Sequence, residues 1–140
     1  MDIHFKYDIV GIDWEAVSSI LEIAGLSSTK PEICRKAFQG SEVTIFVFDN
    51  GKMIGFARAI SDCVMQAAIY DVALLPEYQG KGIGKMLVEG IMNRLSGCNF
   101  ILYSNVGKEA FYERMGFRRL KTGMAKFINS DSMKDRGFIE

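Results

Sequence analysis

Three glycines at positions 80, 82 and 84 alternate with Lys81, Ile83 and Lys85 near the middle of the chain. An apolar run through residues 72–75 precedes them, and a helical pattern of apolar residues follows. Glycines let the backbone come close to a bulky anion. Free N–H groups at a helix start point at such an anion and are helped by the positive end of the helix dipole. The spacing therefore predicts a phosphate-gripping loop between a strand and a helix.

Two familiar phosphate-binding motifs do not match this spacing. A P-loop needs a glycine where Gln79 stands and Ser or Thr where Met86 stands. A dinucleotide fingerprint counted from Gly80 would place its third glycine at Lys85, and its strand would belong to a parallel unit. The ligand predicted is thus a pyrophosphate in another setting. The bland alternative is a glycine-rich turn that caps a helix and binds nothing.

The elements that must position this loop follow from the apolar periodicity. We expect strands at 3–7, 42–48, 53–61, 64–74 and 100–103, helices at 14–24, 31–38, 82–95 and 108–115, and a final hairpin of 117–120 with 124–128. Asp13 is suited to cap the first helix, and Thr29 with Glu32 matches a capping box for the second. Asn50-Gly51 predicts a tight hairpin turn. This order predicts an α+β fold in one domain, residues 1–140, with 129–140 as a loose tail.

The composition narrows the function classes. Seventeen basic and 17 acidic side chains balance, whereas a nucleic-acid binder needs a basic surplus. No apolar run approaches about 18 residues, so we expect no membrane span, and the first residues lack the form of a signal peptide. Three cysteines without a CxxC pair, and one histidine, exclude the usual zinc sets. We expect no metal, reduced and mostly buried thiols, and a cytoplasmic location.

The segment Gln79-Gly80-Lys81-Gly82-Ile83-Gly84 resembles the Q/R-x-x-G-x-G/A hallmark of the GNAT acetyltransferase superfamily. A second segment, residues 105–117, is similar to that family's N-x-x-A-x-x-x-Y-x-x-x-G-F pattern, with Ala110 one or two places off the commonest spacing. The predicted element order covers the family core. The resemblance implies a mixed, mostly antiparallel twisted sheet of six to seven strands flanked by about four helices.

The resemblance also implies acetyl-CoA as cofactor and roles for named residues. Backbone groups of Val72, Ala73 and Leu74 would meet the pantetheine arm and the acetyl carbonyl. The pyrophosphate would be held by Gln79, Gly80, Lys81, Gly82, Ile83, Gly84 and Lys85. Asn105 would hydrogen-bond the pantetheine, and Tyr112 would lie near the cofactor sulfur.

The implied chemistry is direct attack of an amine on a thioester. Only about one alkylamine in a thousand is neutral at pH 7.4, so a dry site or a base must supply the reactive form. The leaving thiolate then needs a proton. A phenol such as Tyr112 can supply it at modest cost, because its ordinary pKa is near 10. The alternative is that Tyr112 only packs.

The general base is less clear from the residues. In many relatives a Glu on the strand before the loop has this role, and Tyr70 stands at the matching position. Asp71 is adjacent, but strand alternation predicts that it faces the other way and is structural, unless a bulge turns it. A water relay is the remaining route. We expect neither Cys63 nor Cys98 to carry the acyl group, and we expect Trp14 to anchor a helix.

We therefore predict an acetyl-CoA-dependent N-acetyltransferase acting on the primary amine of a small molecule. A protein N-terminus or lysine is the variant acceptor. The alternative class is a non-catalytic acyl-CoA sensor, against which Asn105 and Tyr112 argue. A partner-binding domain whose glycine loop is only a turn is a weaker alternative. The expected partner is the amine acceptor, with neither nucleic acid nor membrane, and a homodimer is left open.

Overall fold

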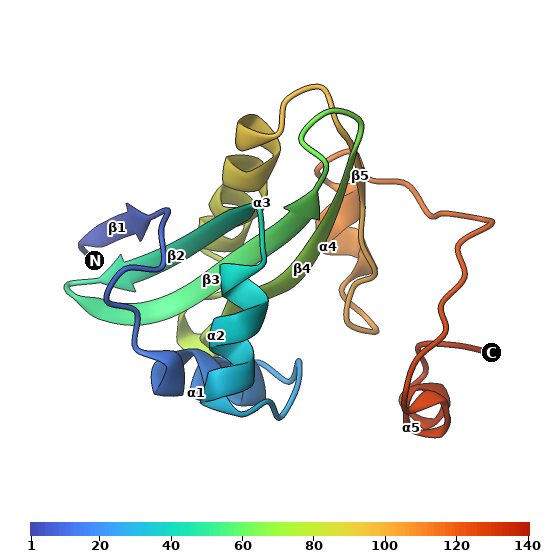
Figure 1. Ribbon diagram of the computed structural model, residues 1–140, viewed down its shortest axis with the longest axis horizontal. Coiled ribbons are helices and arrows are strands. Elements are labelled where there is room, and N and C mark those ends of the chain that lie inside the picture. Colours follow the sequence, from blue (N-terminus) through green and yellow to red (C-terminus); the bar gives the residue numbers. More distant parts are fainter. The chain divides into compact units, whose positions relative to one another are not determined.

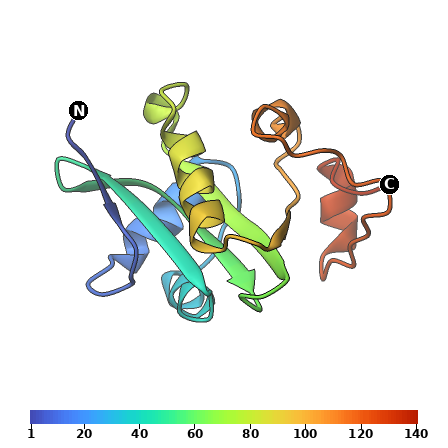
Figure 2. The same cartoon turned by 90° about the horizontal axis from the view of Figure 1, so that it is seen from above.

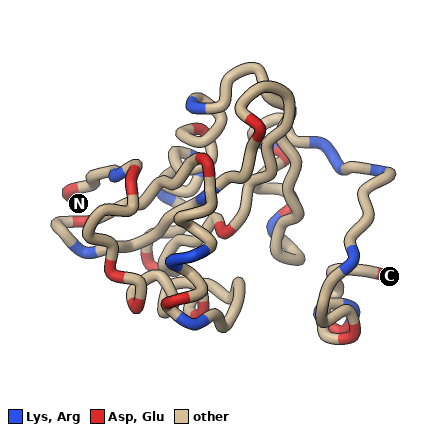
Figure 3. The backbone as a smooth tube through the Cα atoms, in the orientation of Figure 1, with Lys and Arg blue, Asp and Glu red and all other residues tan.

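The structure, a computed structural model, describes all residues from Met1 to Glu140 (Figure 1). The chain divides into two compact units, Met1–Leu102 and Tyr103–Glu140. Figure 3 shows basic and acidic residues distributed along both units without a long run of one sign. No helix has both the length and the apolar character that crossing a membrane would require.

The first unit is built on a five-stranded sheet whose spatial order follows the chain. The strands are β1 (Ile3–Lys6), β2 (Val43–Asp49), β3 (Lys52–Ser61), β4 (Gln66–Leu74) and β5 (Asn99–Ile101). The first four pair antiparallel, and β5 runs parallel to β4. The predicted turn between β2 and β3 is confirmed, since Asn50 and Gly51 both have positive φ, at 48° and 83°.

Helices cover both faces of this sheet (Figures 1 and 2). On one face lie α1 (Trp14–Ile23) and α2 (Pro31–Gln39), and on the other lies α3 (Ile83–Arg94). The ring of Phe38 on α2 packs 5.4 Å from that of Phe46 on β2. Ile45, the residue before Phe46, points to the opposite face and contacts α3 at Gly90. A Cβ added at Gly90 would lie 2.7 Å from the Cδ1 of Ile45. Strand alternation thus divides the apolar residues between two core layers.

The two N-terminal helices begin in different ways. Asp13 caps α1 as predicted, because its Oδ1 accepts from the N–H groups of Glu15 and Ala16 at 3.1 and 3.2 Å. The capping box predicted for α2 is wrong. Lys30 stands at the N-cap with no side-chain cap, and the Thr29 hydroxyl bonds Ser27 instead. Pro31, whose fixed φ suits the first helical position, places the helix start one residue too late for Thr29. Trp14 does anchor a helix, with its ring 5.6 Å from Phe38.

The second unit contains α4 (Glu109–Glu113) and α5 (Ser130–Asp135). The predicted final hairpin is wrong, because residues 117–128 form no strand. Leu120, Met124 and Ile128 are 64%, 98% and 106% exposed, so this segment buries no apolar face that would stabilise a strand pair. The segment expected as a tail includes α5, with Met133 buried. The expected six to seven strands and four helices are therefore corrected to five of each.

Gly55 in β3 has the least room of the glycines in the first unit. A Cβ there would lie 2.5 Å from the Ala73 carbonyl oxygen and 2.9 Å from Leu74 Cδ1. We expect Gly55→Ala to destabilise the protein by about 1–3 kcal/mol, because the backbone of β4 must move. Thermal unfolding measures this, with Gly40→Ala as control, since its Cβ would make only ordinary contacts at 3.6 and 3.8 Å. Equal melting temperatures for the two variants would contradict the expectation.

Candidate active site

Strand β4 parts from β5 halfway along its length. The two strands pair only from Gln66↔Asn99 to Ala68↔Ile101, whereas β4 continues to Leu74 and stays paired with β3 as far as Gly55↔Leu74. The later half of β4 therefore keeps one neighbour and has an edge that β5 does not cover. Such an edge is available to an extended ligand.

The backbone of Leu74 faces that edge. The N–H of Leu75 donates to the Ile54 carbonyl at 2.8 Å, which makes this a hydrogen-bonded position of the ladder. Because such positions alternate in antiparallel strands, Ala73 also bonds β3, and the N–H and C=O of Leu74 point away from it. The Gln79 side chain donates to the Leu74 carbonyl at 3.0 Å. The Leu74 N–H is thus presented at the open edge.

A short turn fixes the entry to the glycine loop. The 3-10 turn η1 (Pro76–Tyr78) follows β4, and the Tyr78 hydroxyl donates to Asp49 Oδ2 at 2.6 Å. The other oxygen of Asp49 accepts from the Asp2 N–H at 2.9 Å. These bonds, chiefly the one from Tyr78, hold the pKa of Asp49 below its ordinary value. The start of the loop is therefore tied to the β2–β3 hairpin.

The loop itself presents backbone N–H groups. Gly80 and Gly82 have φ of 78° and 83°, and a Cβ on either would meet nothing within 4 Å. Backbone conformation therefore requires these glycines, and the space above them is open. Gly82 is the N-cap of α3 and offers no side-chain cap, and the first helical bond runs from Met86 N–H to Gly82 C=O. The N–H groups of the first turn remain for a ligand.

The strand before the loop contains the bulge that was named above only as an exception to strand alternation. Phe56 pairs with Ala73 and Arg58 with Tyr70, so Asp71 and Val72 together oppose the single residue Ala57. Asp71 adopts a left-handed φ of 55°. The expectation that Asp71 faces away from Tyr70 is therefore wrong. Both lie on the α1–α2 face, where Asp71 Oδ2 is 2.7 Å from Arg58 Nε.

Arg58 is the site residue that sequence reasoning missed. Its guanidinium lies 5.7 Å from the ring centroid of Phe38 and 5.3 Å from that of Tyr70, and it donates to the Ser41 hydroxyl at 3.3 Å. The side chains of Arg58 and Asp71 are only 15% and 26% exposed. The signal that was available is a lone arginine inside the apolar run of β3, since a half-buried arginine needs a carboxylate partner.

Asn105 and Tyr112 belong to the second unit. The Asn105 carbonyl accepts from the Lys108 N–H at 3.0 Å, in the turn that leads to α4. The Tyr112 ring packs edge-on against Phe111 and Phe117, with centroids 4.9 and 5.8 Å apart. Burial raises the pKa of Tyr112 to about 12. Tyr112 is therefore a neutral phenol over the whole physiological range.

The three cysteines are free, but only Cys34 is buried, whereas Cys63 is exposed. Desolvation raises the pKa of Cys34, and a hydrogen bond with Glu42 does most to raise that of Cys63. These two thiols therefore stay protonated and are poor nucleophiles. The structure holds no group of three or more His, Cys, Asp or Glu side chains placed to bind a metal ion.

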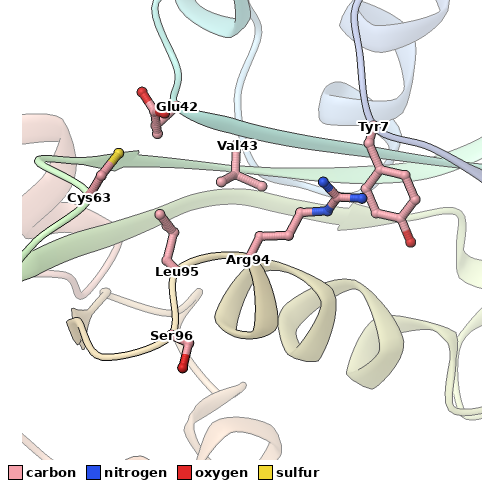
Figure 4. Close-up of a pocket in the computed structure, with 7 residues that line it drawn as sticks. All are labelled: Tyr7, Glu42, Val43, Cys63, Arg94, Leu95 and Ser96. Atoms are coloured by element: carbon pink, nitrogen blue, oxygen red, sulfur yellow. The ribbon is translucent and has the colours of Figure 1, made fainter.

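A surface pocket of about 280 Å³ lies at the other end of α3 (Figure 4). The residues that line it are Tyr7, Glu42, Val43, Cys63, Arg94, Leu95 and Ser96. The Arg94 guanidinium lies over the Tyr7 ring, 3.7 Å from its centroid. Because the 12-residue helix is about 18 Å long, this pocket is remote from the glycine loop. None of the predicted site residues contributes to it.

Comparison with known proteins identifies the family. The family model described as an acetyltransferase (GNAT) domain matches residues 41–119, more than half of the chain. The chain belongs to the GNAT acetyltransferase family. This GNAT chain is 31% identical over 115 residues to serotonin N-acetyltransferase 2, chloroplastic, from Oryza sativa subsp. japonica, covering 76% of the chain and 57% of that protein. It is also 31% identical over 113 residues to an uncharacterised ycf52-like N-acetyltransferase of Prochlorococcus marinus, covering 76% of the chain and 63% of that relative.

The chain thus spans about three fifths of the length of these two relatives. Among solved structures, a probable acetyltransferase from methicillin-resistant Staphylococcus aureus superposes with a TM-score of 0.81 at 24% identity, covering 91% of this chain and 98% of that one. At that identity the likeness establishes the shared fold. The mixed α+β fold expected from the resemblance is thereby confirmed for this chain.

Proposed function

We propose that this GNAT chain transfers the acetyl group of acetyl-CoA to the primary amine of a small molecule. The observation that carries the proposal is the open edge of β4, where the Leu74 N–H is presented, running directly into the uncapped N-terminus of α3. One end of this continuous path suits an amide-bearing arm. The other end suits a pyrophosphate.

In this proposal the pantetheine arm lies along β4 as an additional strand would. Leu74 supplies the backbone donor, with Val72 near it on the strand. Ala73 is only 1% exposed, and its backbone bonds β3 instead of the arm. The loop Gln79–Lys85 holds the pyrophosphate through its N–H groups, with Lys81 and Lys85 adding charge. Lys85 also lies 3.6 Å from Glu89, so it is partly neutralised, and Lys81 is the freer cation. Asn105 would bond the pantetheine.

The reaction forms a nitrogen–carbon bond as the neutral amine attacks the thioester carbonyl. The carbonyl oxygen gains negative charge, which the Leu74 N–H stabilises. The attacking nitrogen gives up one proton to water, the carbon–sulfur bond breaks, and the leaving thiolate takes up a proton from water. Proton transfer from Tyr112, with its pKa of about 12, to a thiolate of pKa roughly 8.5 is uphill by about 5 kcal/mol. We therefore assign Tyr112 chiefly the role of hydrogen-bond donor to the sulfur.

Binding of acetyl-CoA should stabilise the fold, because the folded state alone presents the loop. At about 100 times its dissociation constant the cofactor should add roughly 2.7 kcal/mol, visible in a thermal scan. Gly82→Asp should abolish the shift by placing a negative charge at the N-terminus of α3. Gly82→Asn, which shares the same left-handed strain at φ 83°, is the matched control and should keep part of the shift. A shift with ATP but not with acetyl-CoA would contradict the cofactor assignment.

The acceptor should be a small primary amine, since the rice relative is named as a serotonin N-acetyltransferase. Thiol release from acetyl-CoA should be faster with serotonin and simple arylalkylamines than with lysine peptides or peptides with free N-termini. Faster turnover of the peptides would point to a protein substrate. Binding of acetyl-CoA with no release toward any amine would favour the sensor.

Tyr112→Phe should lower kcat and leave acetyl-CoA affinity nearly unchanged, because only the hydroxyl is removed. General acids contribute about 100- to 10,000-fold, and we expect a loss of about 10- to 100-fold because the phenol acts mainly by hydrogen bonding. With the pKa raised to about 12, Tyr112 should cause no fall in wild-type kcat between about pH 8 and 10. Wild-type turnover by the variant, with chemistry rate-limiting, would make Tyr112 a packing residue.

A further inference from the structure

The Arg58–Asp71 ion pair lies at the β4 bulge, three residues before Leu74. We propose that this pair is a positioning device for acetyl transfer. It holds the bulge, and the bulge determines which backbone N–H of β4 faces the thioester. The inference rests on the proposed function for its catalytic meaning, and on the ladder between β3 and β4 for its geometry.

The bulge sets the register of β4 against β3. Without the bulge, pairing would continue regularly from Arg58↔Tyr70, and Ile54 would then stand opposite Leu74 instead of Leu75. Ile54 occupies a hydrogen-bonded position, so the Leu74 N–H would turn inward to β3. Its side chain would also move to the opposite face. A slip of one residue therefore removes the donor that the proposed reaction uses.

The backbone conformation at the bulge needs a stabilising interaction. A left-handed φ is unfavourable for a residue with a Cβ, and although Asp tolerates it better than most residues, it is still strained there. Regular pairing would relieve that strain. The side-chain interaction with Arg58 exists only when Asp71 lies on the α1–α2 face, which requires the bulge. The ion pair therefore stabilises the bulged register selectively.

The partner is well suited to hold one position. The Arg58 guanidinium lies over the rings of both Phe38 and Tyr70, and it also donates to the Ser41 hydroxyl in the segment after α2. Its side chain is 15% exposed, so solvent screens the pair less than it screens an exposed pair such as Arg35–Glu32. One residue on α2, one in the segment after it and two on β4 thus fix the position of this arginine. The bulge is tied through Arg58 to the helical layer.

The rival role for Asp71 is that of general base toward the acceptor amine. The two roles differ in what they require. A base needs the carboxylate and can dispense with Arg58. The positioning role, called the lock below, means that the ion pair holds the bulge, and it needs Arg58. It does not need the carboxylate when residue 71 adopts a left-handed φ unaided, as glycine does.

Four variants separate these roles: Arg58→Met, Asp71→Asn, Asp71→Ala and Asp71→Gly. We expect Arg58→Met and Asp71→Ala each to lower kcat by about 10- to 100-fold, as loss of an oriented donor does. Asp71→Gly should recover at least about tenfold over Asp71→Ala. The double variant Arg58→Met with Asp71→Asn should lose little more kcat than the more damaging of the two single variants, since both changes break the same ion pair. Arg35→Met, which breaks an exposed pair, should behave as the wild type.

Amide hydrogen exchange gives a readout that needs no turnover. In the wild type the Leu74 N–H should exchange faster than that of Ala73, which bonds β3. Arg58→Met and Asp71→Ala should reduce or reverse this difference, and Asp71→Gly should restore it. An unchanged exchange pattern in Arg58→Met would overturn the lock, whether or not the wild type acetylates any amine.

Kinetic outcomes separate the inference from the proposed function. Equal losses of 100-fold or more in Asp71→Gly and Asp71→Ala, with Arg58→Met near the wild type, would make Asp71 a base and overturn the lock. If the wild type binds acetyl-CoA but acetylates no amine, the proposed function fails, and the exchange pattern alone decides the inference.

Discussion

The geometry of this protein depends on the pairing of β4. Its first half is hydrogen-bonded to both β3 and β5, and its second half is hydrogen-bonded to β3 alone. Parallel pairing with β5 stops at Ala68, while antiparallel pairing with β3 persists to Leu74. A strand edge uncovered inside a fold leaves backbone groups to be satisfied in another way. Gln79 satisfies one of them by bonding the Leu74 carbonyl. The neighbouring N–H remains as a donor at the uncovered edge, where the proposed function places an amide-bearing ligand.

The same pairing explains why small and buried features gather around the end of β4. Gly55 lets β3 pass close to Ala73 and Leu74, and the Tyr78–Asp49 bond ties the following turn to the β2–β3 hairpin. The strand can therefore end at a defined place, from which the loop reaches the start of α3. Because the chain carries no net charge, attraction of a polyanion has to be local. Oriented N–H groups and the helix dipole provide it.

The sequence predicted the elements with strong local signals. The Asp13 cap, the turn at Asn50-Gly51 and the glycine loop each have a mechanism that operates within a few residues, and all three are present in the structure. The bulge could be named only as an alternative to regular pairing, because residues on both sides of Asp71 are apolar or aromatic and fit either register. Only the partner across the sheet, Arg58, distinguishes the two registers. The final hairpin failed for another reason, since apolar residues were present in the segment but it buries too little of them to stabilise a strand pair.

A site that excludes water would favour the neutral form of both groups in the proposed mechanism, the Tyr112 phenol and the acceptor amine. Burial raises the pKa of the Tyr112 phenol because it disfavours the anion. An acceptor amine bound in similarly low-dielectric surroundings would have its ammonium form disfavoured, so its pKa would fall, and each unit of that fall would make the neutral nucleophile about tenfold more abundant. Desolvation would therefore keep the donor protonated and the nucleophile unprotonated at one pH. A reaction in these surroundings depends less on a strong base than on exclusion of water, which is consistent with an Asp71 carboxylate engaged by Arg58.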